Sequence, residues 1–234
     1  MSQASFPLWL HWVATLSLIL AGGCAVVIAI DELRRPQKMW IMNLVWPLTA
    51  LFGSLFWVLL YYRWGRQPAS QEQAAPLPVS VGKGTSHCGA GCTLGDLIAE
   101  WIAWGFPVVA VWFGWHSLFE EKLFAVWIPD FILAFLLGVV FQYFTIAPMR
   151  KLGFKDGLIA ALKADTASIS AWQIGMYGVM ALIQFGWYRA RYGGLAAVAS
   201  VEFWFAMQLA MWAGFATSYP VNWWLLRKGW KEAM

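Results

Sequence analysis

Two cysteines and a histidine lie within six residues of one another near the middle of the chain. They are His87, Cys88 and Cys92, in the segment His-Cys-Gly-Ala-Gly-Cys. Thiolates are soft ligands that select Cu(I) and Zn, and imidazole binds both metals. The two glycines between the cysteines allow a sharp backbone turn that brings both sulfurs toward one point. These residues predict a metal site, with Cu(I) as the expected ion and Zn as the second choice.

The element that positions this motif is a helix predicted to begin just after it. An apolar run starts at Leu94, and Thr93 and Asp96 have the spacing of a capping pair at a helix N-terminus. Cys92 then precedes the helix, where unpaired N–H groups and the helix dipole favour a thiolate. The pattern predicts that Cys92 is ionised and ready for metal or thiol chemistry.

The same motif fits two other interpretations. A membrane thiol–disulfide oxidoreductase or redox sensor would cycle Cys88 and Cys92 between dithiol and disulfide, with a partner such as quinone. An assembly factor or accessory subunit of a membrane complex would use the cysteines as a local clamp in a glycine-rich helix entry. A closed structural zinc site is disfavoured because the chain lacks a second Cys-x-x-Cys half.

The composition excludes an ordinary water-soluble protein. Of the 234 residues, 61% are hydrophobic and 12% are charged, whereas soluble domains carry about 25% charged residues. The 18 tryptophans suit rings anchored at two membrane interfaces, and the net charge of +4 suits loops beside anionic lipid rather than nucleic acid. We predict an all-α inner-membrane protein that forms a single domain over residues 1–234.

Six segments are long and apolar enough to cross a membrane as helices, which takes about 20 residues. They are residues 6–30, 39–62, 94–115, 123–147, 169–188 and 195–219. Residues 64–86 predict a mobile segment of the loop between the second and third helices, and the Cys/His motif follows it in the same loop. Residues 149–167 predict a basic amphipathic connector along the membrane surface. Pro47 and Pro107 predict local kinks.

The distribution of Lys and Arg predicts the orientation of this six-helix bundle. Cytoplasmic loops are enriched in these residues. The N-terminal segment, the second and fourth connections and the C-terminal segment together carry ten of the 16. Both termini and the Cys/His loop are therefore expected in the cytoplasm.

Ionisable and sulfur-containing residues within the predicted helices suggest a path for an ion. Asp96 and Glu100 are four residues apart, on one helix face directly beneath the cysteines. The alternative is that Asp96 caps the helix and Glu100 pairs with a basic residue. Thioethers are soft ligands, although methionines also fill gaps in cores. The further path candidates are Met176, Met180, Glu202, Met207 and Met211.

Several other residues and motifs point to structure rather than chemistry. Asp165 is expected to cap a helix or to pair with Lys163, and His11 and His116 are expected to pack at the interface. No nucleophile triad, phosphate-binding glycine loop, zinc-protease motif or nucleic-acid module is present in the sequence. The sequence therefore favours a non-enzymatic role.

The segment His-Cys-Gly-Ala-Gly-Cys-Thr-Leu-Gly-Asp resembles the signature of an uncharacterised family of small prokaryotic integral-membrane proteins, a domain family of unknown function. Other blocks are similar to that family at residues 42–47, 163–166, 172–178 and 218–224. The resemblance covers most of the chain. It implies a membrane protein of this type with no established activity, loosely associated with heavy-metal handling.

Together these observations predict a membrane protein that binds Cu(I) through His87, Cys88 and Cys92 and hands the ion on or transports it. The expected partners are the lipid bilayer and a metal chaperone or a larger membrane complex.

Overall fold

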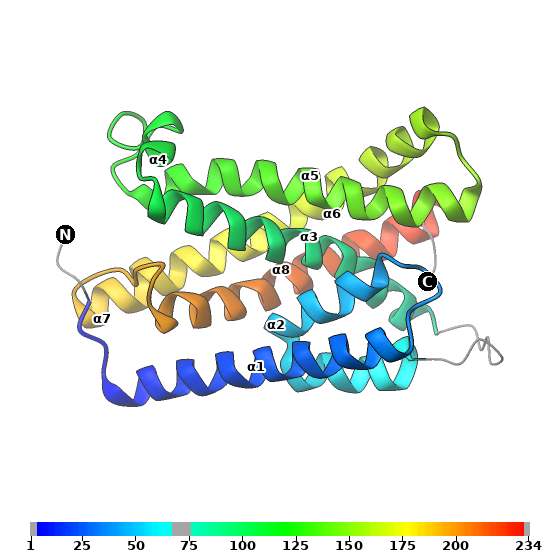
Figure 1. Ribbon diagram of the computed structural model, residues 1–234. Helices are drawn as coiled ribbons and strands as arrows, with labels where there is room; N and C mark the ends of the chain where they lie inside the picture. The colour runs from blue at the N-terminus through cyan, green and yellow to red at the C-terminus, as the bar shows by residue number, and fades with distance from the viewer. Residues whose placement is uncertain (1–3, 67–75, 232–234) are drawn as a thin grey trace.

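The computed structural model describes residues 4–66 and 76–231, and the described chain is built from helices with short connections. The predicted all-α class is confirmed. In chain order the elements are α1 (Leu8–Arg34), α2 (Met42–Leu60), η1 (Tyr61–Gly65), α3 (Leu77–Gly105), α4 (Val108–Trp112), α5 (Lys122–Arg150), α6 (Phe154–Ala181), η2 (Leu182–Arg189), α7 (Ala190–Tyr192) and α8 (Val201–Arg227). The long helices lie side by side in one elongated bundle (Figure 1).

The membrane class is also supported by the helices themselves. Four of the described helical segments are long and apolar enough to cross a membrane: Leu8–Arg34, Met42–Gly65, Lys122–Arg150 and Phe154–Tyr192. The outer face of α1 exposes large apolar side chains, including Leu16 and Ile19, which suits contact with lipid. α3 and α8 are not among these four segments; α3 packs mainly against α5, and α8 packs mainly against α6.

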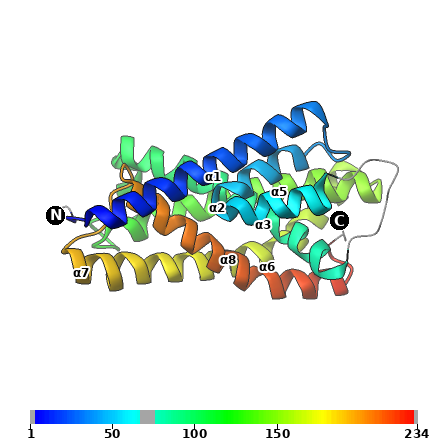
Figure 2. The same cartoon turned by 90° about the horizontal axis from the view of Figure 1, so that it is seen from below.

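α2 does not run along the bundle as one rod. Ser54 has φ 46° and ψ −131°, and the chain reverses there, so that the second half of α2 and η1 return to the end at which α2 began (Figures 1 and 2). The rings of Trp46 and Tyr61 are 5.6 Å apart, whereas a straight helix would separate these residues by about 22 Å. Residues 39–62 therefore form a re-entrant hairpin instead of the predicted second spanning helix.

The base of this hairpin is fastened to the end of α1. The Tyr61 hydroxyl donates to Asp31 Oδ2 at 2.8 Å, and Arg66 Nε lies 2.9 Å from the same oxygen. The predicted kink at Pro47 is not where the chain turns, because Pro47 lies within the first half of the hairpin. Length and hydropathy cannot distinguish a hairpin of two short helices from one long helix, since both bury the same apolar residues.

α3 differs most from the sequence prediction. It begins at Leu77, with Pro78 in its first turn, so the Cys/His motif lies inside a helix and not in a loop. Of the predicted mobile loop, residues 77–86 are helical, and residues 67–75 lie outside the described chain. Thr93 does not cap a helix, because its hydroxyl donates to the Gly89 carbonyl at 2.7 Å. α3 ends at Gly105, and Pro107 is the N-cap of the separate helix α4.

Glycines hold the motif in a helix by letting α3 approach its neighbours. A Cβ atom at Gly91 would lie 2.9 Å from the Cα of Gly138, and one at Gly95 would lie 2.7 Å from the backbone nitrogen of Ala134. The backbones of α3 and α5 are therefore in direct contact, as small residues permit in membrane bundles. The glycines of α3 therefore permit close packing of helices, and the sharp turn predicted from the sequence is not formed.

The ends of the remaining helices also differ from the predicted ranges. The predicted surface connector at 149–167 is divided between the end of α5 and the first half of α6, where small residues such as Gly157 and Ala161 are buried. The fifth helix thus begins at Phe154 instead of residue 169. The last helix, α8, starts at Val201 and continues through Pro220 to Arg227.

The first helix begins at one end of the bundle and the last helix ends at the other (Figures 1 and 2). The reason is the hairpin: α1, α3, α5, α6 and α8 run along the bundle, while α2 turns back within it. This arrangement differs from the predicted bundle of six spanning helices with both termini at the same end.

The close approach of α3 and α5 makes a testable prediction. Gly91→Ala should lower stability by about 1–3 kcal/mol, because the added methyl group meets backbone atoms that cannot move independently. Thermal unfolding in detergent measures the effect. Gly82→Ala is the matched control on the same helix, since a Cβ there meets nothing within 4 Å and alanine favours helix. Equal melting temperatures for the two variants would contradict the packing described here.

Candidate functional site

Four chemically active side chains occupy successive turns of α3. Cys88, Cys92, Asp96 and Glu100 are spaced by four residues, so they share one helix face over about 18 Å. Their exposed fractions are 0%, 0%, 1% and 2%. The buried face of α3 therefore presents two thiols followed by two carboxyl groups along the bundle. We refer to these four residues as the α3 line.

At the first end of the α3 line, Cys88 is enclosed by polar groups. Its thiol donates to Asp165 Oδ1 at 3.1 Å and lies 2.8 Å from the Ser168 hydroxyl. The ammonium group of Lys231 donates to Cys88 Sγ at 3.4 Å. Asp165 thus contacts a cysteine rather than Lys163, its predicted partner, and Lys163 instead lies over the Trp230 ring at 4.0 Å.

His87 does not join the two cysteines. Its Nδ1 lies 3.3 Å from the Thr145 hydroxyl on α5, and its Nε2 has no hydrogen-bond partner among the described residues. In the described parts of the chain, no three His, Cys, Asp or Glu side chains are grouped so that they could hold a metal ion. Cys88 and Cys92 are free thiols one turn apart, without His87 as a third ligand.

In the middle of the α3 line, Asp96 meets a second buried acid from α5, Asp130, which lies within its electrostatic reach. No group within the described chain donates to either Asp96 oxygen, to Asp130 Oδ1 or to Glu100 Oε1. Asp130 is not among the candidate residues named from the sequence. The signal was available, since an ionisable residue inside the apolar run 123–147 marks a functional candidate.

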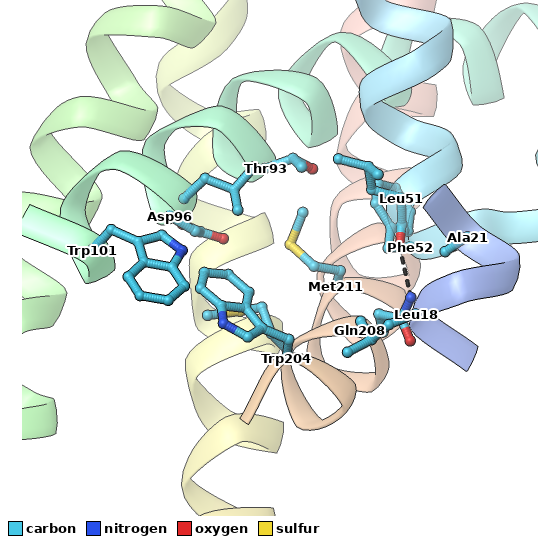
Figure 3. Close-up of a pocket in the computed structure, with 12 residues that line it drawn as sticks. Leu18, Ala21, Leu51, Phe52, Thr93, Asp96, Trp101, Trp204, Gln208 and Met211 are labelled. Carbon is cyan, nitrogen blue, oxygen red and sulfur yellow. Dashed lines mark hydrogen bonds between the residues drawn. The ribbon is translucent and has the colours of Figure 1, made fainter. Parts of the chain in front are cut away.

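Asp96 also lines a cavity of about 280 Å³ between α1, α2, α3 and α8 (Figure 3). Met207 and Met211 of α8 line the same cavity, so three of the predicted path residues meet here. The indole rings of Trp101 and Trp204 stack at 6.1 Å and form part of its wall. The cavity is therefore largely apolar, with a carboxyl group and two thioethers.

The tip of the re-entrant hairpin lines this cavity with Leu51 and Phe52. The break at Ser54 leaves backbone carbonyls without helical partners, and side chains of α8 supply donors instead. Gln208 Nε2 donates to the Leu51 carbonyl at 2.8 Å, and Trp212 Nε1 donates to the Phe52 carbonyl at 3.0 Å. Non-helical backbone at membrane depth is tolerated where it is buried or lines a cavity, and broken helices form the binding sites of many transporters.

A second cavity, of about 350 Å³, lies at the far end of the α3 line. Glu100 lines it together with Lys122 and Gln184. Lys122 Nζ donates to the Ala103 carbonyl at 2.7 Å. The α3 line thus runs from the Lys231 end of the bundle, past the central cavity, to a cavity at the opposite end.

The other predicted path residues lie elsewhere. Met176 and Met180 are buried in the core on α6. Glu202 Oε1 lies within hydrogen-bond distance of His11 Nδ1, at 2.8 Å, near the beginning of α8, so His11 has a polar partner that the sequence did not predict. His116 stacks on Trp115 in the connection between α4 and α5, with ring centroids 4.1 Å apart.

Comparison with known proteins identifies the family but no related structure. The family model described as a domain of unknown function, DUF4396, matches residues 79–231, and the chain belongs to this family. The matched range runs from the first turns of α3 to Lys231, and the similar block at residues 42–47 lies outside it. No curated protein and no solved structure matches the chain.

The hairpin tip provides a second prediction. Gln208→Leu should lower stability by about 1–2 kcal/mol, because it leaves the Leu51 carbonyl without a donor inside the bundle. Gln173→Leu is the matched control, since neither side-chain polar atom of Gln173 has a partner among the described residues. Thermal unfolding of both variants in detergent decides the point, and equal loss of stability would speak against the tip contact.

Proposed function

We propose that this member of the family carries a soft monovalent cation, Cu(I), through the membrane along the α3 line. One observation supports the proposal above all. Sulfur and carboxyl groups occupy four successive turns of a single buried face of α3, over about 18 Å of the helix.

The charges along this series favour a cation as the occupant. A buried ionised carboxylate without a partner costs several kcal/mol. Both carboxyl oxygens of Asp96 and Oε1 of Glu100 are buried and accept no hydrogen bond within the described chain. Such groups become stable when they bind a proton or a metal cation, and acids at membrane depth mark ion and proton pathways.

The sulfur atoms favour Cu(I) among the cations. Thiolates and thioethers select soft ions, whereas Na⁺, Mg²⁺ and similar hard ions prefer oxygen. When Cu(I) binds Cys88, the thiol proton must leave, and Asp165 Oδ1 already accepts a hydrogen bond from this thiol. Asp165 is thus placed to take that proton as the copper–sulfur bond forms.

The arrangement suits passage of the ion rather than storage. Two sulfurs one turn apart do not enclose an ion as the four ligands of a structural zinc site do. Conduction requires binding at several sites that is favourable enough for entry and weak enough for release. The central cavity, with Asp96, Met207 and Met211 beneath the hairpin tip, supplies the next such position.

The alternative of thiol–disulfide exchange is less compatible with this geometry. Residues four apart on a helix have Cβ atoms about 5–6 Å apart, whereas a disulfide needs about 3.5–4.5 Å. Oxidation of Cys88 and Cys92 would therefore distort α3, where a Cβ atom at Gly91 would already be too close to α5. An accessory-subunit role would not require the buried α3 line.

A second candidate function, proton conduction, is favoured by the buried acids alone. Asp96 and Asp130 interact with each other, and no group within the described chain donates to either Asp96 oxygen or to Asp130 Oδ1, which resembles the acid chains of proton relays. This candidate needs the carboxyl groups and does not need the cysteines.

The hairpin leads to a revised proposal for orientation. Only Lys122, Arg189 and Arg191 lie at the end of the bundle where α1 begins, which leaves thirteen of the 16 Lys and Arg residues at the other end. By the positive-inside rule the end with Lys231 and Cys88 faces the cytoplasm, and the N-terminus faces the opposite side. The thiols then face the reducing compartment, where they remain free.

The transport proposal is tested in proteoliposomes. The wild-type protein should accumulate or release Cu(I) down a gradient, and Cys88→Ser with Cys92→Ser should reduce the rate at least about tenfold, because hydroxyls are poor ligands for Cu(I). Cys24→Ser is the control, since Cys24 lies in α1, away from the α3 line. Wild-type transport in the double-serine variant would refute the proposal.

The same vesicles, loaded with a pH-sensitive dye, distinguish proton conduction from Cu(I) transport. Proton flux that persists in the double-serine variant and disappears in Asp96→Asn would favour proton conduction.

The orientation is tested with terminal tags. A C-terminal green fluorescent protein should be fluorescent, and an N-terminal epitope should be digested by protease added to intact spheroplasts, because the hairpin gives an odd number of crossings. A six-crossing bundle instead requires both tags to be protected from the protease, and that result would contradict the re-entrant hairpin.

A further inference from the structure

A third cavity, of about 640 Å³, lies between the return arm of the hairpin (residues 55–65), the first turns of α3, and α8. These segments meet at the end of the bundle where α8 ends (Figure 1). Phe56 and Leu59 of the return arm line the cavity, and their exposed fractions are 48% and 69%. The cavity therefore opens at an apolar surface of the bundle, where lipid chains lie.

The walls of this cavity are held in place by contacts between the helices. Trp57 packs edge-on against Phe215 of α8, with ring centroids 5.2 Å apart. The Tyr219 hydroxyl donates to the Pro78 carbonyl at 3.0 Å and joins α8 to the first turn of α3. A Cβ atom at Gly82, which also lines the cavity, would meet nothing within 4 Å. The protein thus forms the cavity by itself and leaves room for an occupant, as small-molecule sites usually do.

The charged residues that line the cavity are both basic. Arg63 on the return arm is exposed, and Lys83 on α3 is half-buried. Arg63 lies over the Trp64 ring at 5.6 Å, and neither cation forms an ion pair with a carboxylate of the described chain. No Asp or Glu is among the described residues of the lining. Two positive charges therefore stand at this cavity without a described counter-charge.

Two buried indole groups add hydrogen-bond donors to the same lining. Trp46 is 3% exposed and Trp57 is 1% exposed, and Nε1 of each donates to no group in the described chain. A buried N–H group without an acceptor costs free energy, so an occupant that supplies acceptor oxygens is favoured. The cavity combines apolar walls with donors and cations, which suits an amphiphile whose polar end is anionic.

We propose that this cavity binds a membrane phospholipid with an anionic headgroup. The headgroup phosphate would be held at Arg63 and Lys83, and an acyl chain would occupy the apolar part beside Gly82. Basic pockets between transmembrane helices bind anionic lipid headgroups in this way, whereas phosphatidylcholine brings its own ammonium group and gains less from two cations. The inference goes beyond the proposed function, because it does not depend on the ion that the protein carries.

A lipid bound here would touch the return arm, α3 and α8 at once. The cavity is lined by residues of all three elements, including Leu60, Val79 and Phe215. A ligand that binds only the folded protein stabilises it by mass action. The lipid should therefore hold the return arm against the bundle and raise the melting temperature.

The test uses the full chain, stripped of native lipid in a neutral detergent. Phosphatidylglycerol and phosphatidylcholine with the same acyl chains are added separately. Native mass spectrometry measures the bound lipid, and thermal unfolding measures the stability. Phosphatidylglycerol should bind at least about fivefold more tightly and should raise the melting temperature more, because each basic residue near the membrane surface favours an anionic lipid.

Two variants examine the two parts of the site. Arg63→Gln with Lys83→Gln should weaken phosphatidylglycerol binding at least about tenfold and remove the preference over phosphatidylcholine. Gly82→Leu keeps both cations and fills the apolar part, so it should weaken the binding of both lipids; it is the second variant should the first fail to fold. Arg35→Gln with Lys155→Gln is the matched control, because it removes the same charge from exposed side chains outside the lining.

Each outcome decides the inference. Selective binding that both site variants weaken and the control retains supports it. Equal affinity for the two lipids, or unchanged phosphatidylglycerol binding in the variants at positions 63 and 83 or at position 82, overturns it. Displacement of the lipid by an equal concentration of glycerol phosphate shows a site for a free anion and also overturns it. No measurement here involves copper, so Cu(I) transport is judged separately.

Discussion

The contact on which the rest of the structure depends is the approach of two backbones, α3 and α5. Gly91 and Gly95 bring α3 so close to Gly138 and Ala134 that no side chain separates the helices there. Glycine weakens a helix in isolation by about 1 kcal/mol per residue, so the segment is helical because its neighbours enclose it. The same enclosure buries the thiols and carboxyl groups of the α3 line. Close packing of small residues thus determines both the local fold and the chemistry.

The second constraint is the reversal at Ser54. Because α2 returns to the end from which it came, the chain crosses the bundle an odd number of times, and nearly all of the basic residues collect at one end. In the predicted six-crossing arrangement, ten of the 16 Lys and Arg residues lie at one end of the bundle and six at the other. The reversal also leaves carbonyl groups at mid-bundle that Gln208 and Trp212 satisfy. One backbone break therefore affects the orientation, the central cavity and the polar contacts of α8.

The sequence predicts the class of the protein and the approximate helices, because hydrophobic length and charge depletion are properties of single segments. It also predicts the spacing of Asp96 and Glu100 on one face, since that follows from helix geometry alone. It does not predict that Cys88 belongs to the same face, because the glycine-rich segment resembles a loop until α5 packs against it. Asp165 and Lys231 meet Cys88 from 77 and 143 residues away, and no local pattern encodes such pairs.

The order of chemical groups along α3 makes the two ends of the bundle different from the middle and from each other. At the cytoplasmic end proposed here, Cys88 has a buried ammonium group beside it, and its thiol donates to a carboxylate. Farther along, Asp96 and Asp130 have no such cation, and beyond them Glu100 reaches a cavity that also contains Lys122. Fixed positive charges therefore stand at both ends, and the middle has none. Under the proposed transport function, a cation that moves along α3 meets fixed positive charge at both ends and buried acids without a neighbouring cation in the middle.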